Sequence, residues 1–225
     1  MSHFNSADTV SAIGNRLVAL RQSSRKRIMD GTLIARILEG APPKHSYIRY
    51  LKNVYLYAIH SAVVIGLAGA RAVHRSPPVA AYLLHHATEK TGNEARAFSD
   101  LKELGVSEKE ILGSKPTANC LSMIGMEYYY AAHSNPVALL GWMYTLQSLG
   151  EDIGHLVATK VSEGLSFGRR ATSFLRGHAD ADYDHVKGVT ETITRHVPPV
   201  DLAELLYVAE ISARFYGGLI SDALE

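Results

Sequence analysis

The sequence predicts an all-α protein, folded as an antiparallel bundle of about seven main helices. Apolar residues recur every three or four positions, as in Ile48, Leu51, Tyr55 and Ile59, which is the spacing of one helix face. Alternating strand patterns do not occur in the sequence. Long helices joined by short turns fold back on one another as a bundle.

Proline pairs mark the expected helix starts. Pro42-Pro43, Pro77-Pro78 and Pro198-Pro199 each precede a long segment of helical periodicity, and proline is tolerated in the first helical turn but not in the interior. Ser107, followed three residues later by Glu110, offers a capping box for a short helix. The expected helices are 8–22, 25–39, 44–75, 78–104, 107–112, 117–133, 136–166, 169–196 and 200–223.

Composition and charge limit the classes of partner. The 225 residues are 47% hydrophobic and 20% charged, as in a globular protein. Lys and Arg total 23 against 22 for Asp and Glu, so a net charge of +1 gives no electrostatic basis for binding nucleic acid. The single cysteine, Cys120, excludes an internal disulfide and is compatible with a cytoplasmic location. We expect one domain over residues 1–225, with residues 1–42 forming N-terminal helices that pack on the bundle.

Targeting signals are not expected. Residues 1–10 lack a basic region followed by an apolar one, so they do not resemble a signal peptide. The most hydrophobic stretch, 54–73, contains His60 and Ser61 and is closed by Arg71, which makes it too interrupted for a spanning helix of about 20 apolar residues. We expect a central helix buried on most sides, and no membrane partner.

The strongest candidate site lies within an expected helix near the end of the chain. At about 100° per residue, Asp182 lies about 40° from His178 and His185 about 20° from it on the other side, so all three project within a wedge of about 60°. Asp180 and Asp184 point elsewhere. Two imidazoles and a carboxylate suit iron, zinc or manganese. The alternative interpretation is a solvated polar face.

A second polar stripe is expected earlier in the chain. Glu89 lies about 60° and Asn93 about 20° from His86 on a helix, so the three share one face. The alternative is a helix C-terminal region with ordinary surface charges, which Gly92 favours slightly because glycine weakens a helix. Both interpretations stay open.

Two further polar residues stand in apolar surroundings. Gln147 needs hydrogen-bond partners there, and Glu151 follows it by one turn. Glu127 lies in an apolar and aromatic run, and a buried carboxylate must be paired or coordinated. The alternative for Glu127 is pairing with an arginine or a tyrosine hydroxyl.

Together these segments resemble the haem-oxygenase-like iron-containing redox enzymes, a superfamily that includes the TenA thiaminases, the PqqC oxidase and CADD-like proteins. His178, Asp182 and His185 match the family's His-x3-Asp-x2-His motif in full. The resemblance extends over about residues 43–216. It also includes an early long helix around 50–57, a first metal helix and following turn over 86–105 and a second metal helix over 140–147.

The resemblance implies a haem-oxygenase-like bundle and a non-haem, iron-dependent oxidoreductase that activates dioxygen. It implies a small-molecule substrate, an amino acid or an amino-acid-derived metabolite in a biosynthetic pathway, together with a homodimer and no haem. The aromatic residues that could line the substrate cavity are Tyr55, Tyr82, Phe174 and Tyr216, whose alternative role is core packing.

The ligand set departs from the diiron pattern of this family. Diiron members carry a Glu followed seven residues later by a His, where this chain has His86 and Asn93, and a bridging Glu where it has Gln147. Amides are neutral and weaker ligands, so one Fe(II) ion is favoured over two. The favoured ligands are His86, His178, Asp182 and His185, with Gln147, Asn93, Glu89 and Glu127 as possible ligands or supporting residues.

Other functions stay open. A cofactor-independent oxidase like PqqC, or a metal-free ligand-binding protein, would use the histidines as acid–base or hydrogen-bonding groups. A thiaminase is disfavoured, because no base-paired nucleophile pattern surrounds Cys120. A purely structural interaction protein is disfavoured by the inward polar residues.

Overall fold

The computed structural model describes residues 6–40, 43–165 and 168–224. Within these ranges the chain forms helices and no strand, which confirms the predicted fold class. Residues 1–5 of the expected signal-free start, Pro42 of the first proline pair and Ser166 at an expected helix end lie outside the described residues.

The helices follow one another with short connections. The α-helices are α1 (Ser6–Met29), α2 (Thr32–Leu38), α3 (Lys44–Ala72), α4 (Pro77–Glu89), α5 (Glu94–Glu103), α6 (Glu108–Leu112), α7 (Ala118–Tyr128), α8 (Leu139–Gly164), α9 (Ser173–His196) and α10 (Leu202–Asp222). A π-helical turn, η1 (Tyr129–His133), and three 3₁₀ turns, η2 (Pro136–Ala138), η3 (Gly168–Thr172) and η4 (Pro199–Asp201), complete the described elements.

Several expected helix starts are confirmed. Pro77 occupies the first turn of α4 and Pro199 that of η4, where the missing N–H costs nothing. The Ser107 side chain accepts a hydrogen bond of 3.2 Å from the Glu110 backbone N–H and so caps α6. This satisfies one of the backbone donors that a helix start leaves free.

Two expected boundaries are wrong. The predicted break between helices 8–22 and 25–39 lies later, at residues 30–31, between α1 and α2. At the predicted break the Ser23 hydroxyl donates to the Leu20 carbonyl at 2.9 Å, a contact compatible with an unbroken helix, and α1 continues to Met29. The predicted helix 78–104 is divided into α4 and α5 instead. Gly92 adopts a positive φ of 78° there, the left-handed conformation in which glycine commonly ends a helix.

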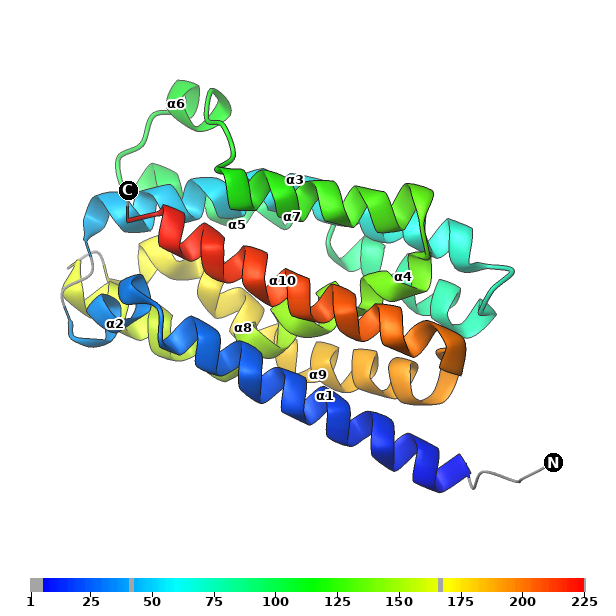
Figure 1. Ribbon diagram of the computed structural model, residues 1–225. Helices are drawn as coiled ribbons and strands as arrows, with labels where there is room; N and C mark the ends of the chain where they lie inside the picture. The colour runs from blue at the N-terminus through cyan, green and yellow to red at the C-terminus, as the bar shows by residue number, and fades with distance from the viewer. Residues whose placement is uncertain (1–5, 41–42, 166–167, 225) are drawn as a thin grey trace.

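The long helices pack side by side around one core (Figure 1). Helices α8 and α9 lie along each other, α3 packs on α4 and α5, and α10 packs on α7 and α8. Helix α1 runs along the outside of the bundle beside α10, whereas α6 projects from one end (Figure 1). Arg21 ties α1 to α8 through ion pairs with Glu151, at 3.0 Å, and with Asp152.

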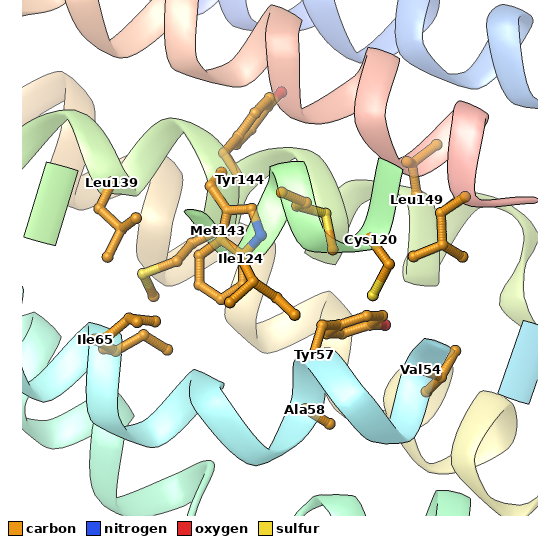
Figure 2. Close-up of a cluster of buried hydrophobic side chains, with 14 of the residues drawn as sticks. Val54, Tyr57, Ala58, Ile65, Cys120, Ile124, Leu139, Met143, Tyr144 and Leu149 are labelled. Atoms are coloured by element: carbon orange, nitrogen blue, oxygen red, sulfur yellow. The ribbon is translucent and has the colours of Figure 1, made fainter. Parts of the chain in front are cut away.

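The centre of the bundle is an apolar layer between α3, α7 and α8 (Figure 2). Burying these side chains supplies the main driving force for assembly, at about 25 cal/mol per Å² of apolar surface. Helix α3 is long and apolar enough to cross a membrane, but only by length and composition. Half of its most apolar window is buried inside the bundle. The side chains of the apolar layer that Figure 2 labels are Val54, Tyr57, Ala58, Ile65, Cys120, Ile124, Leu139, Met143, Tyr144 and Leu149.

Candidate functional site

A cavity of about 110 Å³ lies inside the bundle, with walls from α2, α3, α4, α8, α9 and α10. His86 lines this cavity, and the ring of His185 is centred 4.7 Å from the His86 ring. The fold therefore brings together polar residues from three distant segments of the sequence. The predicted site residues that line the cavity are His86, Asn93, Gln147, Phe174, His178, Asp182 and Tyr216.

Both ring nitrogens of His86 face polar groups, although the residue is only 2% exposed. Nε2 accepts a hydrogen bond of 2.9 Å from the Gln147 side-chain amide, so the ring proton lies on Nδ1, which is 2.9 Å from Glu89 Oε2. Burial lowers the pKa of His86 to about 3, and the positive charge of Lys90 acts in the same direction. The ring is therefore neutral at pH 7, the form that binds metals or accepts protons.

His178 repeats this arrangement on α9. Its Nδ1 donates to the Phe174 backbone carbonyl at 3.0 Å, and its Nε2 accepts from the Asn93 side-chain amide at 2.8 Å. Burial lowers the pKa of His178 to about 3, again with Lys90 acting in the same direction. Asn93 reaches this imidazole from the turn at Gly92, not from a continuous helix.

These two amide–imidazole pairs bear on the kind of metal site that the cavity can offer. Gln147 and Asn93 stand where diiron relatives of this fold were expected to carry a carboxylate and an imidazole, and each now engages the Nε2 lone pair of a histidine. Two cations would need those lone pairs and a bridging carboxylate. Neither Gln147 nor Asn93 offers a carboxylate or an imidazole for this purpose.

Asp182 holds the third imidazole in position. It is 1% exposed, and its Oδ1 accepts a hydrogen bond of 3.3 Å from His185 Nδ1. Its Oδ2 lies so close to α8 that a Cβ on Gly150 would approach it to 1.8 Å, so a larger residue at position 150 would displace the Asp182 carboxylate. Burial raises the pKa of Asp182, while His185 and Lys90 oppose that change.

One group of donors does fit a single metal ion. His86, Glu89 and His185 each offer one ligand atom, and these atoms lie within 4.8 Å of one another. His185 Nε2 faces Glu89 Oε2 at 3.7 Å, while Asp182 fixes the other nitrogen of the ring, an outer support typical of metal-binding histidines. Two imidazoles and one carboxylate form the donor set of non-haem Fe(II) oxygenases. Glu89, expected as a possible ligand or supporting residue, is one of the three, and His178 and Asp182, the other two expected ligands, lie outside this group of three.

Lys90 is the site residue that the sequence reasoning missed. It lines the cavity from the end of α4 and is half-buried. Burial lowers its pKa, and Asp182 and Glu89 oppose that change. The signal was present in the spacing, because a residue four positions after His86 lies about 40° from it on a helix.

The four predicted aromatic residues separate into two pairs. Phe174 and Tyr216 line the cavity, and the Tyr216 hydroxyl lies 2.8 Å from that of Tyr50. Tyr55 packs against Phe98 with ring centroids 5.8 Å apart, and Tyr82 stacks on His86 at 5.8 Å. Among the described residues, neither Tyr55 nor Tyr82 contributes to the cavity wall.

Two residues lie apart from this chemistry. Glu127 on α7 is 0% exposed, and neither of its oxygens has a hydrogen-bond partner in the described part of the chain, so the expected pairing is absent. Burial raises the pKa of its carboxyl well above the usual range. Cys120 is buried in the apolar layer of Figure 2, and burial raises its pKa to about 12. That shift is opposite to the one that activates a nucleophilic thiol.

The chain is similar to known proteins in both sequence and fold. Residues 48–216 match the family of iron-containing redox enzymes. A search of curated proteins found no match.

Solved structures show the same fold. A domain of unknown function with a heme oxygenase-like fold from Shewanella denitrificans OS217 has a TM-score of 0.83 and 23% identity, covering 95% of this chain and 91% of that one. Heme oxygenase-1 from the cyanobacterium Synechocystis sp. PCC6803, in complex with heme, has a TM-score of 0.74 and 13% identity, covering 93% and 91%. A CADD-like protein of unknown function from Nostoc punctiforme PCC 73102 has a TM-score of 0.68 and 14% identity, covering 93% and 99%.

Proposed function

The chain belongs to the iron-containing redox enzymes, and on that premise we propose that it is a non-haem oxidoreductase that uses one iron ion and dioxygen. The substrate is a small molecule, such as an amino acid or a metabolite derived from one, held in the adjacent cavity. The observation that carries the proposal is the cluster of His86, Glu89 and His185, with ligand atoms within 4.8 Å of one another. Bound iron would supply the electron transfer to dioxygen that protein side chains cannot perform.

The protein's own groups prepare this site by placing protons. In the metal-free arrangement the His86 proton lies on Nδ1, facing Glu89, and Gln147 donates to Nε2. Binding through Nδ1 requires the proton to move to Nε2. Gln147 can serve that tautomer too, because its Oε1 is buried without a partner and can accept from Nε2–H once the amide has turned. Gln147 thus supports both protonation patterns of the ring.

A second function is favoured by a separate observation. Amide donors already engage Nε2 of His86 and His178, and the charge of Lys90 acts on both rings. A cofactor-independent oxidase or a metal-free ligand-binding protein would use these neutral imidazoles as bases toward an organic ligand. Iron binding separates the two functions.

The deciding experiment is an anaerobic Fe(II) titration of chelator-treated protein, with bound iron measured by elemental analysis after desalting. We expect about one iron per chain for the parent and a loss of at least tenfold in affinity for His86→Ala, Glu89→Gln and His185→Ala. His155→Ala is the matched control, since His155 is an exposed histidine of α8 that pairs with Asp180 at 3.1 Å. Failure of the parent to bind iron would favour the metal-free function.

A further inference from the structure

We propose that the cavity binds a small apolar carboxylate, with the carboxylate group paired to the Lys90 ammonium. This inference builds on the proposed function, because it names the substrate class of the same cavity. The pairing itself needs no metal, and it is therefore tested on metal-free protein.

The size and the walls of the cavity set the body of the ligand. The volume of about 110 Å³ is of the same order as the cavity of about 150 Å³ that holds a benzene molecule in an engineered protein core. Most of the wall is formed by aliphatic and aromatic side chains, so the body of the ligand is apolar and about the size of one aromatic ring. Residues that form this apolar wall include Leu33, Ile34, Ile37, Ile65, Ile153 and Val157.

Lys90 sets the charge of the ligand. Other lysines of the chain meet carboxylates directly, as Lys26 meets Asp30 at 2.5 Å and Lys52 meets Glu110 at 2.6 Å. Within the described residues, Lys90 has no hydrogen bond and no ion pair within 4.0 Å, although it is half-buried against the cavity. A buried charge without a partner is unfavourable. An anionic group entering the cavity would supply that partner.

Two further polar atoms indicate that the cavity is incomplete without a ligand. Gln147 Oε1 and Trp142 Nε1 are buried, belong to residues of the cavity wall and have no hydrogen-bond partner among the described residues. Gln147 is 5% exposed and Trp142 is 4% exposed. A buried polar atom without a hydrogen bond is unfavourable. A ligand that pairs with Lys90 and also forms a hydrogen bond with one of these atoms would therefore gain binding free energy from both interactions.

Nearby charges favour an anion once a metal is present. Lys90 and Arg96 contribute positive charge here, and Asp182 and Glu89 contribute negative charge. Arg96 lowers the pKa of Lys90, whereas Asp182 and Glu89 raise it. A divalent cation bound by Glu89 and two neutral imidazoles would leave the site with excess positive charge. A carboxylate substrate offsets that excess, so iron should strengthen its binding.

The test compares acids with their uncharged amides. Calorimetric titration of the chelator-treated full chain would use benzoate against benzamide and hexanoate against hexanamide. We expect the acid to bind at least tenfold more tightly than its amide in the parent, Lys90→Met to abolish that preference and Lys90→Arg to keep part of it. Lys52→Met, which alters an ion-paired lysine outside the cavity, is the control and should leave the preference unchanged.

The outcomes separate this inference from the proposed function. Equal binding of acid and amide, a preference that survives in Lys90→Met, or no binding of either acid would overturn the pairing with Lys90. Acid binding that needs iron and ignores Lys90 would overturn it as well, while leaving the iron-dependent function intact. Lys90-dependent acid binding by a protein that takes up no iron would support the inference and overturn the proposed function.

Discussion

Asp100 of α5, at the start of α9, and Glu127, near the end of α7, are both completely buried, yet only one of these carboxyls has hydrogen-bond partners among the described residues. Asp100 accepts hydrogen bonds from the backbone N–H and the hydroxyl of Ser173, at 2.9 and 2.6 Å, and from the Phe174 N–H at 2.9 Å. Glu127 has no partner among the described residues. Both are 0% exposed, so burial alone does not reveal the role of a carboxyl. Asp100 caps the start of α9 by accepting hydrogen bonds from its first N–H groups. Glu127 makes no hydrogen bond with the described residues.

Removing the hydrogen-bonded carboxyl of Asp100 should have the largest effect on stability. Asp100→Ala leaves the first donors of α9 unpaired inside the protein, and we expect the free energy of unfolding to fall by about 3 kcal/mol. Urea denaturation followed by circular dichroism measures this. Asp100→Asn, which keeps one acceptor oxygen, should lose clearly less. Equal losses in the two variants would show that the hydrogen bonds to Ser173 and Phe174 do not hold the helix start.

The carboxyl of Glu127, which has no hydrogen-bond partner among the described residues, should make stability depend on pH. Burial raises the pKa of Glu127, so the folded state holds the proton more tightly than the unfolded state does. Stability is therefore complete below the ordinary pKa of about 4.3 and falls as pH rises toward the raised value, by about 1.4 kcal/mol for each pH unit of that window. Glu127→Gln has no proton to lose, so its advantage over the parent should grow with pH between 4 and 8. A constant difference would mean that a partner keeps the pKa of Glu127 ordinary.

A third variant introduces a new buried carboxyl into the cavity. Gln147→Glu with Asn93→His restores the diiron ligand types, and without metal it should cost about 1–2 kcal/mol because the new carboxylate shares a cavity with Asp182. Added Fe(II) should restore that stability by binding the folded state and raise the iron content toward two per chain. Metal titration and melting temperatures check this beside the parent. Unchanged stoichiometry, with no extra iron-dependent rise in melting temperature, would contradict the placement of these two side chains at a metal.

Helix periodicity predicts which side chains share a face of one helix, but not which residues of different helices come into contact. It placed His178, Asp182 and His185 on one face of α9, because backbone geometry alone fixes those directions. Spacing could not reveal that Gly92 would turn the chain and bring Asn93 to His178, nor that the amides would occupy the imidazole nitrogens. Those contacts depend on how α4, α8 and α9 pack. The failed pairing of Glu127 has the same origin, since a burial pattern does not say which groups a helix will meet.

Carboxyls that face water complete the comparison and should matter least. Asp180 and Asp184 are exposed on α9, and Asp180 pairs with the exposed His155. Exposed ion pairs contribute little, so alanine at either position should change the free energy of unfolding by less than about 0.5 kcal/mol. Neither change should alter iron uptake, because both side chains point away from the cluster. Asp182→Ala, in contrast, removes the acceptor of His185 Nδ1, and the freed ring should bind iron more weakly. Denaturation and iron titration of the three variants side by side check the difference, and Asp184→Ala losing iron as readily as Asp182→Ala would refute the inward direction assigned to Asp182.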